Sequence, residues 1–310
     1  MDRPEALEFS ETGRRLGHDL FRYGRLAHER ALPRPVMEGI ADARGRGVVR
    51  ETADRFVGKW VQIRLNAFRR ERVVDHAVTP ALIAQIDVPV CPVTREHLTH
   101  GAMLSTDWSV DRLNNDGAYA PNNLAVMSSR ANRAKGSRSF EDVIVLSRAA
   151  EEVGGLTPLE WLRMASLMLG PCFAEQASRA PVIPLAAPIP GRTARQAVQL
   201  IQYAFTQGAA AQSGKNLLIR RFRPVCRTEA AHARLDRFAD AMHVALKHST
   251  PCWDAWLRPE VFAAFVSWRN TLDLRSWMLA GEVAREFVGG RRIAADHIRD
   301  WRLDQRGYVQ

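Results

Sequence analysis

Residues 88–138 interrupt an otherwise helical sequence with a strand–turn–strand pattern, and this interruption constrains the fold most. The segment VPVCPVT is β-branched and broken by prolines, and the later pieces STDWSVDRL and NLAVMSS are typical of extended chain. The NNDG at 114–117 lies between those two pieces and is a strong turn signal. SRANRAKGS then carries helix formers, so the pattern predicts two strands followed by a helix.

The segments on both sides of this insert have the hydrophobic spacing of helices. Before it, we expect one helix that Pro33 and Pro35 stop, and a second that spans about 48–74. Three further helix starts carry capping signatures or a proline in the first turn. They are Thr79-Pro80, Ser139 with Asp142, and Thr157 with Glu160.

We therefore predict a mainly α fold with a small α+β insert. Four prolines in 178–192 predict a linker or an extended surface crossing. The predicted parts are a helical N-terminal region (1–87), the α+β core (88–152), a packing helix (153–177), the Pro-rich linker (178–192) and a helical C-terminal domain (193–310). Five tryptophans in the C-terminal part have amphipathic spacing, so we expect a helix core there. They are Trp253, Trp256, Trp268, Trp277 and Trp301.

The formal net charge of +10 points to a polyanionic partner, with nucleic acid first and an acidic membrane surface second. Of the 44 basic residues, 40 are arginine and 4 are lysine. A GC-rich genome produces the same excess of arginine, so net charge by itself leaves the partner open.

The cysteines and the apolar segments further limit the class of protein and where we expect it to be found. Cys91, Cys172, Cys226 and Cys252 lie far apart without a CxxC pair, so we expect free thiols and no disulfide framework. No stretch reaches the roughly 18–20 apolar residues of a membrane span. The first residues carry acidic side chains and no apolar core, so we expect no signal peptide and a cytoplasmic protein.

Asp111 ends the first predicted strand, and Asn132 lies on the helix that follows the second. Hard divalent cations prefer oxygen ligands such as these. Cutting a phosphodiester bond needs such an ion to stabilise charge and a base to activate water. A hairpin followed by a short helix can aim one ligand from each element at the same phosphate, so the arrangement favours a phosphodiesterase site.

The string SVDRLNNDGAYAPNNLAVMSSRANRAKGS resembles the HNH (His-Me finger) endonuclease family, and the VPVCPVT before it is similar to the first knuckle of such domains. The resemblance covers about 50 of the 310 residues. It implies a ββα-metal core flanked by helical regions, metal-dependent hydrolysis of phosphodiester bonds in DNA, and one divalent ion, Mg²⁺ or Mn²⁺.

The resemblance implies a role for each matching position. Asp111 matches the metal-binding Asp, and Asn132 matches the second metal ligand. Asn123 matches the Asn that braces the loop behind the active site. Lys135 matches a basic residue near the phosphate. Arg112 stands where the family has its base His.

The exchange of that His for Arg112 is the main departure from the family pattern. A guanidinium stays protonated at any accessible pH, so it takes no proton from water, but it can bind a phosphate oxygen. The base must then come from elsewhere. His97 and His100, just upstream, are the candidates, and water activated by the ion alone is the alternative.

Two further groups of residues complete the predicted site. Arg130, Arg133, Lys135 and Arg138 follow helical spacing, so we expect a clamp on the nucleic-acid backbone, with a solvated face as the alternative. Zinc-braced members of the family carry two CxxC knuckles. Here those positions read Cys91 with Thr94 and Ser128 with Ala131, which leaves one ligand of four and predicts no structural zinc.

The leading hypothesis is a metal-dependent HNH-type endonuclease acting on DNA. The alternative is a catalytically impaired HNH-fold module for DNA binding or assembly, which would bind DNA without cutting it. A third hypothesis is a scaffold whose C-terminal helices bind a protein partner.

Overall fold

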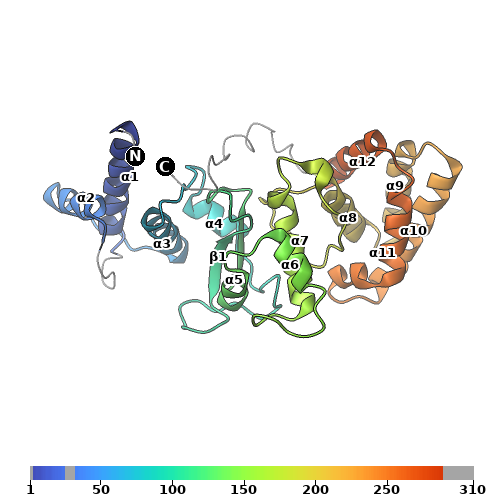
Figure 1. Ribbon diagram of the computed structural model, residues 1–310, viewed down its shortest axis with the longest axis horizontal. Coiled ribbons are helices and arrows are strands. Elements are labelled where there is room, and N and C mark those ends of the chain that lie inside the picture. The colour runs from blue at the N-terminus through green and yellow to red at the C-terminus, as the bar shows by residue number, and fades with distance from the viewer. Residues whose placement is uncertain (1–2, 25–31, 289–310) are drawn as a thin grey trace. The chain divides into compact units, whose positions relative to one another are not determined.

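The computed structural model describes residues 3–24 and 32–288 (Figure 1). This part of the chain is mainly helical and contains one two-stranded antiparallel sheet, as the sequence predicts. It divides into two compact units. Unit 1 comprises 3–24, 32–88 and 110–126, and unit 2 comprises 89–109 and 127–288.

The boundary between the units crosses both strands of the hairpin, whereas the sequence predicts one core over 88–152. Backbone hydrogen bonds within unit 1 give the reason. Tyr119, in the hairpin loop, donates from its N–H to Val73 O at 3.1 Å and accepts from Asp75 N at 2.9 Å. The loop is thereby joined to the chain that follows the N-terminal helices.

Unit 1 contains four helices. They are α1 (Arg3–Arg22), α2 (Arg34–Gly45), α3 (Arg55–Arg69) and α4 (Pro80–Ile86). Their buried apolar cluster consists of Leu16, Leu20, Val36, Val61, Leu65 and Phe68. Thr79 caps α4 by accepting a hydrogen bond from Leu82 N at 3.2 Å, which confirms the helix start predicted at Thr79-Pro80.

Helix α2 corrects the sequence prediction, which has no helix between Pro35 and about residue 48. Pro33 is the N-cap of α2 and Pro35 lies in its first turn, where a missing N–H costs nothing, so the two prolines start a helix. They do not stop the preceding one as predicted, because α1 already ends at Arg22. The next helix is shorter than predicted because Asp54 caps it. Its carboxylate accepts from Phe56 N and Val57 N, both at 2.8 Å.

Helices α1 and α2 meet through glycines that touch the opposite backbone. A Cβ at Gly17 would lie 2.1 Å from Val36 O, and one at Gly39 would lie 2.0 Å from Arg14 O. Neither contact leaves room for a side chain, since a backbone carbonyl cannot rotate away. The two helices are therefore held at a separation that only glycine permits.

The Gly39→Ala substitution is expected to lower the free energy of unfolding by about 1–3 kcal/mol, the usual cost of overpacking. The added methyl group must push α2 away from α1 and loosen the cluster beneath. Urea unfolding of the full chain measures the change. Gly45→Ala is the matched control, because a Cβ at the end of α2 meets no atom within 4 Å. Equal destabilisation by both variants would contradict the tight crossing.

Unit 2 contains the remaining helices of the described residues. They are α5 (Ser129–Lys135), α6 (Phe140–Leu146), α7 (Pro158–Cys172), α8 (Ala197–Gly208), α9 (Gln212–Phe222), α10 (Glu229–Lys247), α11 (Pro259–Arg269) and α12 (Leu274–Phe287). Both predicted caps are confirmed, because Ser139 with Asp142 and Thr157 with Glu160 form reciprocal capping boxes. Fully buried aromatic side chains from α8, α9, α10, α11 and the turn before α11 pack against one another. They are Phe205, Phe222, Phe238, Trp256, Phe265 and Trp268.

The predicted helix core of the C-terminal part is confirmed for Trp256, Trp268 and Trp277, while Trp253 is half-buried and Trp301 lies outside the described residues. The Pro-rich segment 178–192 begins within a 3-10 turn that ends at Arg179 and has no helix or strand over 180–190, but much of it is buried. Ala186 N donates to Ser166 Oγ on α7 at 3.1 Å, and Gln202 on α8 donates to Ile183 O at 3.0 Å. The segment is therefore a packed crossing and not a free linker.

Candidate functional site

The candidate site is built on the hairpin of β1 (Trp108–Arg112) and β2 (Leu124–Ser128), with α5 following directly. Burial alternates along β1, so that Ser109 and Asp111 are half-buried between buried neighbours. Because successive side chains of a strand point to opposite faces, Ser109 and Asp111 share one face of β1 and Arg112 lies on the other.

Asn132, the second predicted ligand, lies half-buried on α5. Its Nδ2 donates a hydrogen bond to Ser109 Oγ at 2.6 Å. Because the amide nitrogen donates this hydrogen bond, the oxygen Oδ1 is the atom of the side chain that could bind a cation. Asn132 and Ser109 both belong to unit 2. Asp111 belongs to unit 1, and we assign it to the candidate site only because it lies on the same strand face as Ser109.

Asn123 is fully buried and ties the hairpin loop together. Its Oδ1 accepts from Asn114 N at 2.7 Å, and its Nδ2 donates to Asn114 O and Ala118 O, both at 2.9 Å. Its backbone oxygen also accepts from Leu113 N at 2.8 Å. One side chain therefore satisfies three backbone groups that would otherwise be costly to bury.

Arg112 lies inside the same loop and not at a phosphate position. The residue is 8% exposed, and its Nη1 donates to Asn115 O at 3.0 Å and to Gly117 O at 2.8 Å. Its guanidinium also lies over the ring of Tyr119, 5.1 Å from the centroid. The alternation of β1 turns this side chain to the buried face, so it holds the loop from within and departs from the predicted phosphate contact.

The predicted backbone clamp does not form one surface. Lys135 is 0% exposed, so its ammonium group is not accessible to a nucleic acid in this structure. Arg130 is half-buried and paired with two carboxylates, Glu160 at 2.6 Å and Glu96 at 3.3 Å. Helical spacing predicted a common exposed face for these residues. In the structure, Glu160 of α7 and Glu96 of the chain before β1 cover Arg130 on that face.

The other two residues of the predicted clamp, Arg138 and Arg133, differ from each other in exposure. Arg138 is half-buried, lies over the ring of Trp161 at 5.5 Å and donates to Ala134 O. Arg133 is exposed. Of the four predicted residues, Arg133 is therefore the one whose charge faces solvent.

The two candidate base histidines are both exposed. His97 forms a backbone bridge with Val90, and His100 packs edge-to-face on Trp108 with ring centroids 5.2 Å apart. Trp108 belongs to the buried face of β1, opposite Ser109. His100 therefore lies next to the hairpin, in contact with a residue of the face opposite to Ser109.

Cys91 shows what holds the two predicted knuckles together. Its thiol is fully buried, and its Sγ accepts hydrogen bonds from Thr94 N at 3.4 Å and from Ser128 N at 3.2 Å. Ser128 in turn caps α5 by accepting from Ala131 N at 3.2 Å. Hydrogen bonds therefore link the four knuckle positions, two of them directly to the Cys91 sulfur and Ala131 through Ser128.

Asp107, which the sequence does not single out, organises the loop before β1. Its carboxylate accepts from Thr99 Oγ1 at 2.6 Å and from the N–H groups of Ala102 at 3.1 Å and Met103 at 2.7 Å. The hydrogen bond from Thr99, with the backbone N–H groups after it, holds the pKa of this carboxyl below its ordinary value. A cluster of N–H groups around one Asp depends on loop geometry, so residue spacing gives little signal for it.

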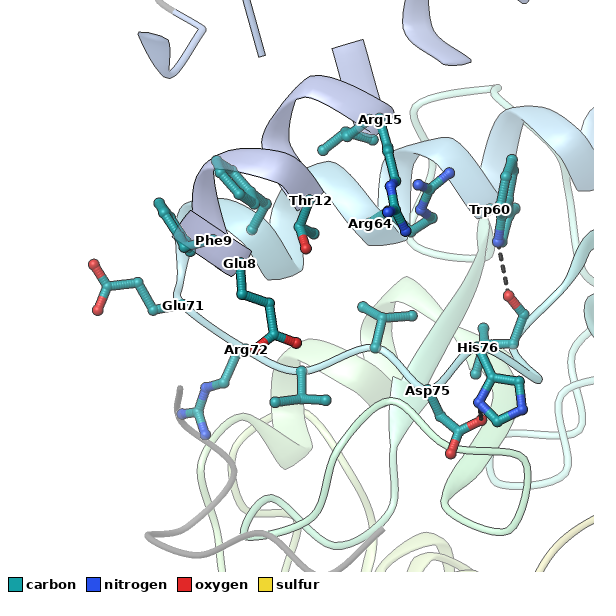
Figure 2. A pocket seen from close by; sticks show the side chains of 15 residues that line it. Glu8, Phe9, Thr12, Arg15, Trp60, Arg64, Glu71, Arg72, Asp75 and His76 are labelled. Atoms are coloured by element: carbon teal, nitrogen blue, oxygen red, sulfur yellow. Dashed lines mark hydrogen bonds and ion pairs between the residues drawn. The ribbon is translucent and has the colours of Figure 1, made fainter. Parts of the chain in front are cut away.

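A separate cavity of about 600 Å³ lies in unit 1 between α1, α3 and the segment 71–78 (Figure 2). The indole of Trp60 donates to Val78 O at 2.7 Å and carries the Arg64 guanidinium over its ring at 4.2 Å. Three arginines and three carboxylates line the cavity together with aromatic side chains, so it selects neither sign of charge. It therefore supports no ligand assignment.

We compared the chain with protein-family models, with curated proteins and with solved structures, and found no match in any of the three comparisons. The HNH family accordingly stays a resemblance carried by the residues of the hairpin and α5. Among the helices of the described ranges, none has both the length and the apolar character that crossing a membrane requires.

Proposed function

We propose that the protein is a metal-dependent HNH-type endonuclease that hydrolyses phosphodiester bonds in DNA. The observation that carries the proposal is the buried Asn123, which ties both ends of the hairpin loop by its side chain. This is the bracing role that the resemblance implies for that position. The succession of β1, β2 and α5 supports the proposal further, since it supplies the strands and the helix of a ββα core.

The donor atoms fit a hard divalent cation. Asp111 offers a carboxylate and Asn132 an amide oxygen, the ligand types that Mg²⁺ and Mn²⁺ prefer. The hydrogen bond from Asn132 Nδ2 to Ser109 Oγ uses the nitrogen of the amide and leaves Oδ1 as its ligand atom. Among the described residues, no group of three or more His, Cys, Asp or Glu side chains is arranged so that it could hold a metal ion. Two protein ligands suit Mg²⁺, which keeps several waters and binds substrate phosphate.

Each residue then has a defined task. When bound, the ion would stabilise negative charge on the scissile phosphate and make water easier to deprotonate. Asp111 supplies the charge that attracts the cation, and Ser109 orients the amide of Asn132. Asn123 and Arg112 hold the loop between the strands, which limits the motion of Asp111 at the end of β1.

Plasmid nicking by the full chain tests the proposal. We expect supercoiled DNA to be converted to the open circle with Mg²⁺ or Mn²⁺ and not with EDTA. Asn132→Ala is expected to lower the nicking rate on the order of 10–100-fold, the range seen when residues that support a metal site are changed. Asn216→Ala, at an exposed asparagine of α9, is the control and should leave the rate unchanged. Equal rates in the Asn132 variant and the wild type would remove Asn132 from the site.

A second candidate function is a DNA-binding or assembly module that has lost cleavage. The position of the base His is taken by a residue that braces the loop, and Lys135 is buried, which favours this candidate. It predicts salt-sensitive DNA binding with no nicking under either ion. A gel-shift assay beside the plasmid assay separates the two functions.

A further inference from the structure

An arginine patch lies at one end of the α1–α2 pair in unit 1, away from the hairpin in sequence. We define it as Arg22 at the end of α1, Arg44 near the end of α2, and Arg46 and Arg50 in the chain that follows. All four side chains are exposed. Three of them lie over aromatic rings, Arg22 over Tyr23 and both Arg44 and Arg50 over Phe21.

Two of the four arginines are paired with carboxylates. Arg22 bonds to Glu51 at 2.6 Å, and Arg46 bonds to Asp42 at 2.9 Å. For Arg44 and Arg50, no carboxylate partner is found within residues 3–24 and 32–288. These two carry the net positive charge of the patch.

The ring of Phe21 holds both of these charges. The guanidinium of Arg50 lies 4.9 Å from the ring centroid and that of Arg44 lies 6.0 Å from it. Phe21 itself is 7% exposed, so it is a fixed support for the two side chains. Cation–π contacts of this kind restrict the guanidinium groups before any ligand binds, which lowers the entropy cost of binding.

Two like charges near one ring repel each other, and the carboxylates of the described residues nearby, Asp42 and Glu51, pair with Arg46 and Arg22 and not with either of them. An anion that contacts both guanidiniums would offset it. Closely spaced phosphates of a nucleic-acid backbone provide such anions in series, and arginine suits phosphate because of its planar, bidentate geometry. The patch therefore matches a phosphate backbone better than a single isolated anion.

We propose that Arg44 and Arg50 bind the phosphate backbone of duplex DNA. The aromatic side chains argue against recognition of unpaired bases, because Phe21 is buried and Arg22 lies over the ring of Tyr23 at 5.6 Å. Contacts to the backbone position a protein on DNA without reading its sequence. The choice of DNA as the polyanion rests on the proposed function.

The salt dependence of DNA binding tests this inference. Binding of the full chain to a short fluorescent duplex is measured in EDTA, so that no cleavage occurs, over a series of salt concentrations. Loss of two phosphate contacts in R44Q/R50Q should weaken binding and reduce the slope of log K against log salt by about 1.8, since each contact contributes about 0.9. An unchanged slope would overturn the inference.

Two further variants separate charge from folding. Arg14→Gln with Arg34→Gln removes the same amount of charge from the α1–α2 pair, but both of those arginines bond to Glu38, at 3.0 and 2.9 Å. This control should keep the wild-type slope. The charge-preserving R44K/R50K should also keep most of the slope, and a loss equal to that of R44Q/R50Q would point to damaged packing at Phe21 and overturn the inference.

The failure of the inference and that of the proposed function are distinguishable. A reduced slope in R44Q/R50Q together with no nicking by the wild type supports the patch and overturns the endonuclease. Nicking that depends on Asn132 with no change of slope in R44Q/R50Q does the reverse. Binding to vesicles of phosphatidylserine and phosphatidylcholine that depends on Arg44 and Arg50, with DNA binding unaffected, would assign the patch to an acidic membrane and overturn the inference.

Discussion

Replacing Asp111 by Asn is expected to reduce the metal-dependent nicking rate on the order of 100-fold or more. The substitution keeps the shape of the side chain and removes the one negative charge that the proposed ligand pair offers to a cation. Metal ions supply several kcal/mol of charge stabilisation in the transition state, and each 1.4 kcal/mol corresponds to about a tenfold change in rate. Initial rates of plasmid nicking at fixed Mg²⁺ measure the effect.

The control for this variant is Asp116→Asn, which removes the same charge from the hairpin loop at an exposed position. It should nick at close to the wild-type rate. Thermal unfolding of both variants checks that the hairpin is intact. Wild-type activity in Asp111→Asn would exclude Asp111 from the chemistry and, with it, the proposed metal site.

Replacing Asn123 by Ala is expected to lower the free energy of unfolding by about 3 kcal/mol. The change removes three hydrogen bonds to backbone groups of the loop, at Asn114 and Ala118. Each of the three bonds contributes about 1 kcal/mol net, which gives the expected loss of about 3 kcal/mol. A buried group left without its partner costs about 1–3 kcal/mol, and partial access of water to the loop limits that additional cost. Urea unfolding of the full chain measures the loss.

Two variants separate hydrogen bonding from side-chain size. Asn123→Asp keeps the oxygen that accepts from Asn114 N but directs a second oxygen at two carbonyls, so it should also be destabilising. Asn122→Ala changes the half-buried neighbour and should alter stability by less than about 0.5 kcal/mol. Equal stability of Asn122→Ala and Asn123→Ala would show that the loop does not depend on the Asn123 brace.

The parts of the fold that depend on neighbouring residues were predictable from the sequence. Thr79, Ser139 and Thr157 each accept a hydrogen bond from an N–H three residues on, and that bond is encoded locally. The turn at 114–117 and the two strands around it follow from residue type in the same way. The position of Asn123 between those strands was likewise visible as a motif.

The exposure of the basic residues was not predictable. Helical spacing predicts neighbouring turns for Arg130, Lys135 and Arg138. It does not show that Glu160 and Trp161 of α7 contact Arg130 and Arg138, or that Lys135 is buried. Arg112 is a similar case, since two carbonyls of its own loop satisfy it only after the hairpin has closed. Long-range packing decides whether a cation faces solvent, and one sequence carries little signal for it.

Helix α2 was missed because glycine and proline indicate turns when they are considered one at a time. Pro33 and Pro35 occupy the start of a helix, where proline is well tolerated, and Gly39 lies in its middle. Gly39 would weaken an isolated helix by about 1 kcal/mol relative to Ala. Glycine is needed at position 39 because the backbone there lies against Arg14 O on α1. That contact is between two helices, so it cannot be predicted from the helix propensity of single residues.

The interleaving of the two units has a consequence for how the chain is made and dissected. Unit 1 takes residues 110–126 from within a hairpin whose outer ends belong to unit 2. During translation, the partner of Val73 and Asp75 leaves the ribosome only after some 40 further residues, so unit 1 cannot be completed when α4 emerges. A gene cut after residue 88 would likewise remove an integral part of unit 1. Separating the two units in the described chain requires three cuts, after residues 88, 109 and 126, and the last two fall within strands of the hairpin.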